Sequence, residues 1–170
     1  MTLVQFIFFY NAAVITLCSY LVVTRRNPVH SVLFMLLMFF HIAGLYLSLN
    51  SEFIAALQVI VYAGAILVLF LFVIFLLNLR DESLEDKSIT NWPTAAVISL
   101  SLFAVVTGIT SGLKPGATGQ WSIEKINEVT HIKAIGMVLY TEYIFPFEVA
   151  SLVLLVAMIG AITLAKKHVD

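Results

Sequence analysis

The chain has 170 residues, of which 61% are hydrophobic and only 11% are charged, and its mean hydropathy is +1.04. Soluble domains average roughly 45–50% apolar and about 25% charged residues, so this composition excludes a soluble globular enzyme and an intrinsically disordered protein. Nine Lys and Arg residues against ten Asp and Glu residues give a net charge of −1, which argues against a nucleic-acid-binding protein.

Five long apolar segments predict transmembrane helices, and therefore an all-α polytopic membrane protein with a single membrane domain over residues 1–170. A helix needs about 20 mostly apolar residues to cross a hydrocarbon core about 30 Å thick, and its backbone satisfies its own hydrogen bonds. Glu148 is the only charged residue of the sequence inside these segments. The predicted helices are residues 3–23, 29–49, 53–79, 94–113 and 144–165.

The positive charges beside the spans predict that the N-terminus lies outside the membrane and the C-terminus inside. No Lys or Arg precedes the first span, so we expect an uncleaved helix rather than a signal peptide. Lys and Arg accumulate on the cytoplasmic side of membrane proteins. In this orientation the outer loop, residues 114–143, holds three of them, and the inner flanks hold Arg25, Arg26, Arg80, Lys87, Lys166 and Lys167.

Local signals predict where helices begin and what the two longer loops contain. Asn27 followed by Pro28 is typical of a helix start, and Ser51 is expected to cap the third helix. The inner loop, residues 80–92, is acidic in its first half and is expected to be solvated. In the outer loop one short amphipathic helix is predicted, because an apolar residue recurs every third position at Ile123, Ile126, Val129 and Ile132.

The middle of the third helix is the most distinctive stretch of the sequence. Gln58 and Tyr62 are four residues apart, so we expect both on one side of the helix, hydrogen-bonded and turned away from lipid. Ala63, Gly64 and Ala65 make the helix thin, which allows another backbone to approach and tolerates a local π-bulge. Close packing alone is the alternative interpretation of these small residues.

Few side chains could perform chemistry inside the membrane. His41 in the second span is either a proton relay or ligand, or a polar residue that hydrogen-bonds a neighbouring helix. Glu148 could carry protons or fix a neighbouring subunit, or it is an interfacial residue near a helix start. One cysteine, Cys18, and scattered histidines give no metal motif, and no catalytic signature is present, so we expect no active site in this chain.

Three stretches of the sequence resemble the J-type membrane subunit of bacterial NADH:quinone oxidoreductase, respiratory complex I. The first is Asn-Pro-Val-His-Ser at residues 27–31, and the second, most specific one is Leu-Gln-Val-Ile-Val-Tyr-Ala-Gly-Ala-Ile at residues 57–66. The third is Pro-Phe-Glu at residues 146–148, followed by the apolar residues 154–161. The resemblance extends over nearly the whole chain, and the two long loops are its least informative parts.

The resemblance implies a five-helix, non-catalytic subunit of the membrane arm in the bacterial cytoplasmic (inner) membrane, with no cofactor of its own. NADH, FMN, iron–sulfur clusters and quinone would be used in other subunits. Its implied partners are the H-type quinone-site subunit, the small A-type and K-type subunits and a neighbouring antiporter-like subunit. The resemblance also implies a π-bulge in the third helix, at Tyr62, Ala63, Gly64 and Ala65. A change of this bulge to a regular α-helix would open or close a path of water molecules. Some family members carry Glu at the position of Gln58, where an amide could only orient water or hydrogen-bond a neighbour.

Three hypotheses follow from these observations. The first is a coupling subunit of a proton-pumping NADH:quinone oxidoreductase, with a switchable third helix and with Gln58, Glu148 and His41 as candidates for a proton path or polar contacts. The second is a purely structural scaffold of the same complex or of a related membrane-bound hydrogenase-like complex. The third is a free-standing small transporter, which the absence of an internal repeat disfavours.

Overall fold

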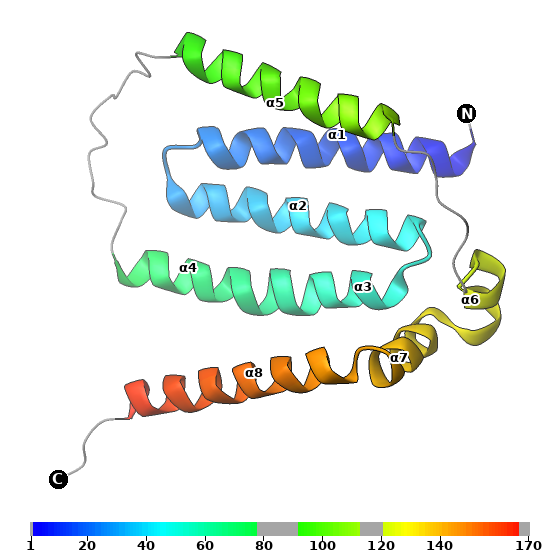
Figure 1. The fold of residues 1–170 in the computed structure, drawn as a ribbon. Helices are drawn as coiled ribbons and strands as arrows, with labels where there is room; N and C mark the ends of the chain where they lie inside the picture. The colour runs from blue at the N-terminus through cyan, green and yellow to red at the C-terminus, as the bar shows by residue number, and fades with distance from the viewer. Residues whose placement is uncertain (1, 78–91, 113–120, 167–170) are drawn as a thin grey trace. The chain divides into compact units, whose positions relative to one another are not determined.

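The computed structural model describes residues 2–77, 92–112 and 121–166, and every regular element in these three ranges is helical. Five helical stretches are long and apolar enough to cross a membrane, which confirms the all-α class and the five predicted spans (Figure 1). The third span is continuous through three elements, α3, η1 and α4. The spans are α1 (Leu3–Thr24), α2 (Pro28–Ser48), α3 (Glu52–Leu57) with η1 (Gln58–Ile66) and α4 (Leu67–Leu76), α5 (Trp92–Gly112) and α8 (Ile144–Ala165).

The chain divides into two compact units, residues 1–119 and residues 120–170. In the first unit α2 is the central helix, with α1 packed on one side and α3, η1 and α4 on the other (Figure 1). The short turns between these spans make neighbouring spans antiparallel. The single membrane domain and the orientation of the termini stay predictions.

A small apolar core joins α2 to α4. The side chains of Val32, Leu67 and Ile74 are buried there, with Met35 and Phe39 packed against them. Most other large apolar side chains of the described spans are exposed, and α5 and α8 contain no buried residue. Helices that are apolar on all sides are stable where lipid or other membrane helices cover them. The chain alone therefore leaves most of its apolar surface for such surroundings.

The helix starts follow the local sequence in two of three cases. The side chain of Asn27 accepts a hydrogen bond from the Val29 N–H at 2.9 Å, with Pro28 as the first residue of α2, as predicted. Thr2 and Gln5 form a reciprocal capping box at the start of α1. The expected Ser51 cap is wrong: with φ −104° and ψ 57°, Ser51 lies outside the extended region from which a capping side chain reaches the first turn.

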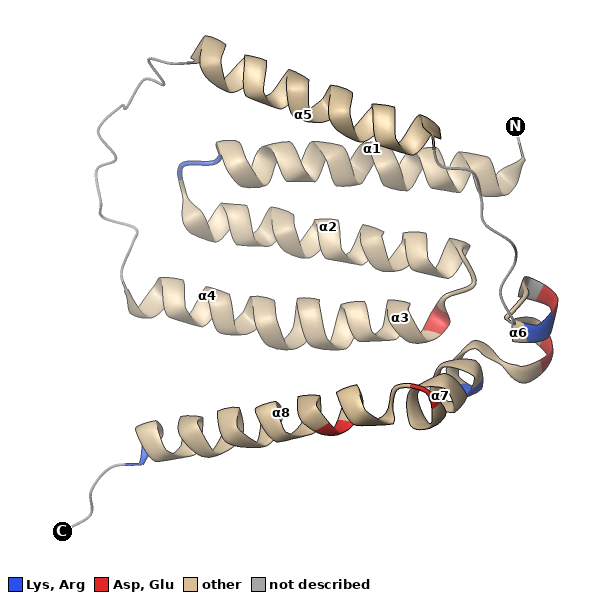
Figure 2. Ribbon diagram, viewed as in Figure 1, with Lys and Arg blue, Asp and Glu red and all other residues tan. Residues whose placement is uncertain are grey.

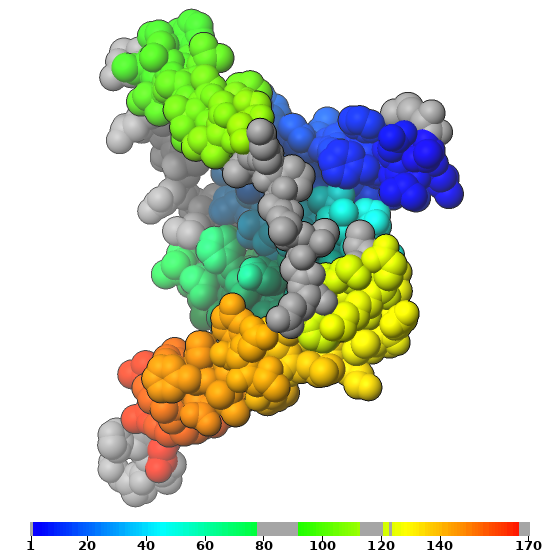
Figure 3. Space-filling model, turned by 45° about the vertical axis from the view of Figure 1, so that its right-hand side comes forward, coloured from blue at the N-terminus to red at the C-terminus, as the bar shows by residue number. Residues whose placement is uncertain are grey.

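The second unit contains α6 (Ile123–Val129), α7 (His131–Thr141) and α8, with α6 packed on α7 and α7 on the start of α8 (Figure 3). The prediction of one short amphipathic helix is wrong in its extent, because the periodic residues are divided between two helices. Thr130 separates them with a φ of 76°, a left-handed conformation that an α-helix cannot contain. Most charged residues of this unit lie on α6 and α7 (Figure 2), and Glu148 belongs to α8.

Parts of both predicted loops lie outside the described residues. This applies to the acidic half of the inner loop and to the Lys-Pro-Gly segment that begins the outer loop.

Candidate functional site

The third span changes from α-helical to π-helical geometry over nine residues, from Gln58 to Ile66. The backbone N–H of Leu67 donates to the carbonyl of Tyr62, five residues earlier, which is the π pattern. The spacing of the buried side chains changes within this segment. Gln58 and Ala63 are buried and five residues apart, which is the spacing of a π turn. Ala63 and the next buried residue, Leu67, are four residues apart, which is the spacing of an α turn. The π geometry that the resemblance implies at residues 62–65 is therefore present, and it begins one turn earlier.

Gln58 and Tyr62, both in η1, differ in burial. The Gln58 side chain is 7% exposed, whereas Tyr62 is 49% exposed. Ala63 is buried beside Gln58 in this span, and the expectation that Gln58 and Tyr62 share one side of the helix, hydrogen-bonded and turned away from lipid, stays a prediction. The Tyr62 ring packs edge-on against Phe39 of α2, with ring centroids 6.1 Å apart and an interplanar angle of 76°.

Gly64 fits the π-segment because it has no side chain. A Cβ atom added at Gly64 would lie 3.3 Å from the carbonyl oxygen of Val59, five residues earlier, which is tighter than most real contacts of a Cβ. This close approach belongs to the wide turn itself. Any larger residue at this position therefore crowds the π geometry.

A second polar site joins α1 to α2. The Tyr10 hydroxyl lies 3.4 Å from His41 Nε2, and His41 Nδ1 lies 2.8 Å from the Leu37 carbonyl oxygen. A carbonyl can only accept, so Nδ1 carries the proton, and Nε2 accepts a hydrogen bond from the hydroxyl. His41 thus hydrogen-bonds a neighbouring helix, as the second interpretation of its sequence position predicts, and any role in a proton path stays a prediction.

Sequence reasoning missed the neighbouring residue Asn11. Its side chain is 6% exposed, its Nδ2 donates to the Ile7 carbonyl at 2.9 Å, and its Oδ1 lies 3.2 Å from the position of a Cβ on Gly44 of α2. A buried amide against a glycine fixes the register of two membrane helices and their close approach. The available signal was an Asn in the middle of an otherwise apolar span.

The remaining predicted candidates do not form a metal centre. Among residues 2–77, 92–112 and 121–166 no three His, Cys, Asp or Glu side chains lie close enough to hold a metal ion. Cys18 is a buried free thiol in α1. Glu148 is exposed on the second turn of α8, in the second unit, and its role stays a prediction.

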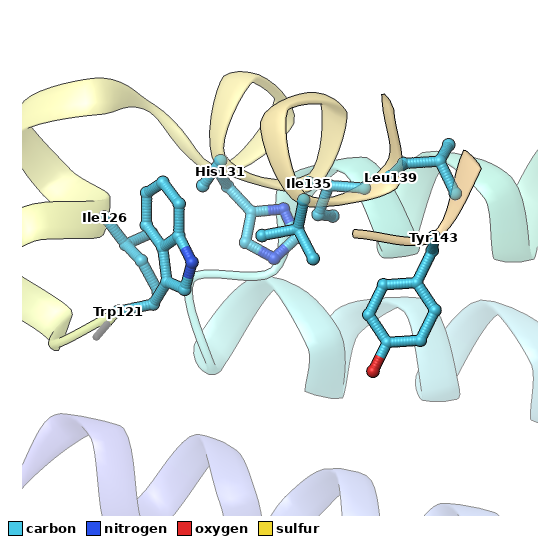
Figure 4. A pocket seen from close by; sticks show the side chains of 8 residues that line it. Trp121, Ile126, His131, Ile135, Leu139 and Tyr143 are labelled. Atoms are coloured by element: carbon cyan, nitrogen blue, oxygen red, sulfur yellow. The ribbon is translucent and has the colours of Figure 1, made fainter. Parts of the chain in front are cut away.

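The second unit contains an apolar hollow of about 320 Å³ between α6, α7 and the start of α8. The His131 ring lies between Trp121, Ile126 and Ile135, and Leu139 and Tyr143 extend the lining (Figure 4). His131 Nδ1 is buried and has no hydrogen-bond partner among the described residues. This hollow was not predicted, and its residues contain no nucleophile paired with a base.

Comparisons with known proteins identify the family of the chain. The family model of NADH-ubiquinone/plastoquinone oxidoreductase chain 6 matches residues 18–164. NADH-quinone oxidoreductase subunit J of Rhodobacter capsulatus is 39% identical over 170 residues, covering 99% of this chain and 84% of that protein. The subunit J of Rickettsia felis is 41% identical, with 96% and 81% covered. NADH-ubiquinone oxidoreductase chain 6 of Marchantia polymorpha is 38% identical, with 93% and 85% covered.

The matched region contains η1, His41, Gly44 and Glu148, whereas Tyr10 and Asn11 precede it. The similarity to the relatives extends over nearly the full chain, and the helical content and the five spans fit a multi-pass membrane protein. The chain therefore belongs to the NADH-ubiquinone/plastoquinone oxidoreductase chain 6 family, as a membrane subunit of an NADH-quinone oxidoreductase.

Proposed function

We propose that this chain couples quinone reduction to proton translocation through a change in the helical register of η1. Quinone chemistry in another subunit would favour one of two packings of the third span, and the packing would decide whether water can connect neighbouring proton-carrying groups. The chain would contribute no electron carrier and no active site. The observation that supports this proposal best is the nine-residue π-segment in the middle of a span.

A change of η1 to α-helix would move specific side chains. An α-helix turns by about 100° per residue, so losing the extra residue of the wide turn would rotate the following part of the span by about that angle relative to Gln58. Tyr62 would then occupy the buried position four residues after Gln58, and Ala63 would leave it. The Tyr62 hydroxyl would come to the side of the Gln58 amide and would leave Phe39.

The residues of the π-segment would have different roles in this switch. Gly64 would act as the hinge, because its missing side chain admits the Val59 carbonyl at 3.3 Å from the Cβ position. Ala63 and Ala65 would keep the helix thin enough to rotate against α2. Tyr62 would supply the hydrogen-bonding group, and Gln58 would orient water or hydrogen-bond a neighbour without taking up a proton.

The partners and location follow from the same proposal. We expect the chain beside the H-type quinone-site subunit, the A-type and K-type small subunits and an antiporter-like subunit of the membrane arm. The cofactors NADH, FMN, iron–sulfur clusters and quinone would all be bound elsewhere in the complex. The Rhodobacter and Rickettsia relatives support a bacterial cytoplasmic membrane as the location.

Substitution of Gly64 tests the coupling role. Gly64→Leu would place a side chain against the Val59 carbonyl and crowd the π form by about 1–3 kcal/mol, the usual cost of overpacking. We expect the complex to assemble, while quinone-linked NADH oxidation and proton pumping fall at least about fivefold in membrane vesicles. Gly108→Ala in α5 is the matched control, because no described atom lies within 4 Å of a Cβ at Gly108.

The scaffold hypothesis predicts a different result for the same variants. Under that hypothesis Gly64→Leu and Tyr62→Phe would change only the amount of assembled complex on a native gel. Normal turnover and pumping per assembled complex in both variants would exclude the switch. His41→Gln and Glu148→Gln, measured in the same assay, would show whether either residue belongs to a proton path.

A further inference from the structure

The apolar hollow of the second unit is formed by one side of α7 together with one side of α6. Eight described side chains line it, and none of them is charged. On α7 the lining residues His131, Ile135 and Leu139 recur every four residues, so they share one side of the helix. Ile126 adds α6 to the same surface (Figure 4). None of the functions proposed above uses this surface.

Charged residues of α6 and α7 lie on the side opposite the hollow. Successive residues of an α-helix are about 100° apart, so a step of two residues brings a side chain to the other face. Lys133 is two residues from Ile135, and its side chain is exposed. Glu124 and Glu128 are each two residues from Ile126, and both are exposed as well. The pair of helices is therefore amphipathic, with the hollow on its apolar side.

The break at Thr130 brings the two apolar sides together. Ile126 and Ile135 are nine residues apart, and nine residues of one continuous helix turn by about 900°, which would place them on opposite sides. The left-handed φ of 76° at Thr130 starts α7 in a new direction, and both isoleucines line the same hollow. A β-branched residue is strained in this conformation, so the arrangement has a cost that its surroundings must offset.

The length of α8 sets the level of α7 in the membrane. With 22 residues α8 is about 33 Å long, close to the hydrocarbon thickness of about 30 Å, so Ile144 lies at the edge of the hydrocarbon core. Only Glu142 and Tyr143 separate α7 from α8, and two residues span about 7 Å at most. The headgroup layer on each side of the core is about 5–8 Å thick. The end of α7 therefore lies in this layer.

A bend between α7 and α8 turns α7 away from the axis of the span (Figure 1). The Tyr140 ring packs edge-on against Phe147, with ring centroids 5.1 Å apart. In one straight helix these two residues, seven apart, would be separated by about 10 Å along the axis. The N–H groups of Glu142 and Tyr143 both donate to the Val138 carbonyl, which closes α7 at the bend. A helix that bends at this level runs along the membrane surface.

The aromatic side chains of the hollow are those typical of the membrane surface. Trp121 and Tyr143 both line it, and Trp and Tyr are enriched at the level of the headgroups. The Lys125 ammonium lies 5.0 Å from the centre of the Trp121 ring. This ring thus contacts both an exposed cation and the apolar hollow, as a ring between water and lipid does.

We propose that α6 and α7 lie in the lipid headgroup layer at the start of α8, with the hollow turned toward the acyl chains. Lipid would cover Ile126, Ile135 and Leu139, while Glu128 and Lys133 would face water. The helix pair would fix the depth of α8 in the bilayer. The proposal needs only the membrane-spanning role of α8 and is independent of the coupling role of η1.

A photoreactive residue in the assembled complex identifies what covers the hollow. In one variant p-benzoylphenylalanine, which reacts with C–H groups that it touches, replaces Leu139. The complex is illuminated in its native membrane, and mass spectrometry and gel electrophoresis identify the products. We expect an acyl-chain adduct on the Leu139 peptide. The matched control has the same substitution at Lys133, on the opposite side of α7, where we expect no lipid adduct.

A second pair of positions gives the same comparison on α6. Substitution at Ile126 should give the lipid adduct and substitution at Glu128 should not, which tests the proposal even if the α7 variants do not assemble. A crosslink from Leu139 or Ile126 to another subunit, or to another part of this chain, overturns the proposal, because protein then covers the hollow. Equal lipid adducts on both sides of the helices, or none at either hollow position, overturn it as well.

Discussion

Single polar side chains in α1 and α2 pair across the helix interface. Tyr10 with His41, and Asn11 with the backbone of Gly44, are adjacent contacts on the same two helices. In lipid no water is present to hydrogen-bond a polar group. Polar residues of membrane helices are therefore found where a neighbouring helix supplies a hydrogen-bond partner. These contacts therefore set the register of α1 against α2.

The contact of Asn11 with Gly44 predicts a measurable coupling between two substitutions. Gly44→Ala places a Cβ 3.2 Å from Asn11 Oδ1, and we expect a destabilisation of about 1–3 kcal/mol, seen as a lower thermal midpoint of the assembled complex. Asn11→Ala/Gly44→Ala removes the obstruction and should recover part of that loss. Gly160→Ala in α8, where a Cβ meets open space, is the control. Purely additive effects in the double variant would contradict this contact.

Among whole elements, η1 and the break between α6 and α7 both depart from a regular α-helix, for different reasons. In η1 the departure is one extra residue in a turn, and the helix axis continues into α4. At Thr130 the backbone is left-handed, and the chain starts a new helix. A wide turn can revert by a change of register, whereas a left-handed residue ends a helix. The first is therefore the better candidate for a switch.

The start of α6 predicts a pH dependence for this helix. Hydrogen bonds from its own backbone N–H and from the Ser122 hydroxyl lower the pKa of Glu124 below the ordinary 4.5. A carboxyl whose folded-state pKa is depressed stabilises the folded helix at pH values above its unfolded pKa, and this stabilisation is lost as pH falls through the lowered value. Ser122 also accepts a hydrogen bond from the Lys125 N–H at 3.3 Å, so the cap and the carboxylate act together.

Amide hydrogen exchange, corrected for its intrinsic pH dependence, measures this effect. We expect the α6 amides to be protected at pH 7 and to lose protection as the pH falls below about 4.5. Glu124→Gln should remove the pH dependence, whereas Glu128→Gln, in the last turn of the same helix, should preserve it. Identical profiles for the two variants would show that Glu124 does not stabilise α6.

For the whole molecule, most of the apolar surface is available to lipid or to other subunits. The described core joins α2 to α4, while α5 and α8 contribute no buried residue. A membrane protein of a large assembly needs few internal contacts, because its neighbours cover the remaining helix faces. This distribution agrees with membership of a multisubunit oxidoreductase and disfavours a free-standing transporter.

The orientation of the whole chain gives a further prediction. Because six of the nine Lys and Arg residues lie on one predicted side of the membrane, we expect the C-terminus inside and the loop of residues 114–143 outside. A fluorescent protein fused to the C-terminus should fluoresce, and alkaline phosphatase inserted after residue 117 should be active. The reverse pattern of reporter activity would invert the assignment of both sides.

The sequence by itself determined the number and approximate ends of the spans, because the transfer of apolar residues into lipid depends on composition and length alone. It also singled out Gln58, the small residues 63–65 of the third span and the start of α2 at Asn27, where local residue types limit the backbone. Only the tertiary structure decided which residues of that span are buried and that Asn11 meets Gly44. Those facts depend on how one helix packs against another: in η1 Gln58 and Ala63 are buried, while Tyr62 is 49% exposed.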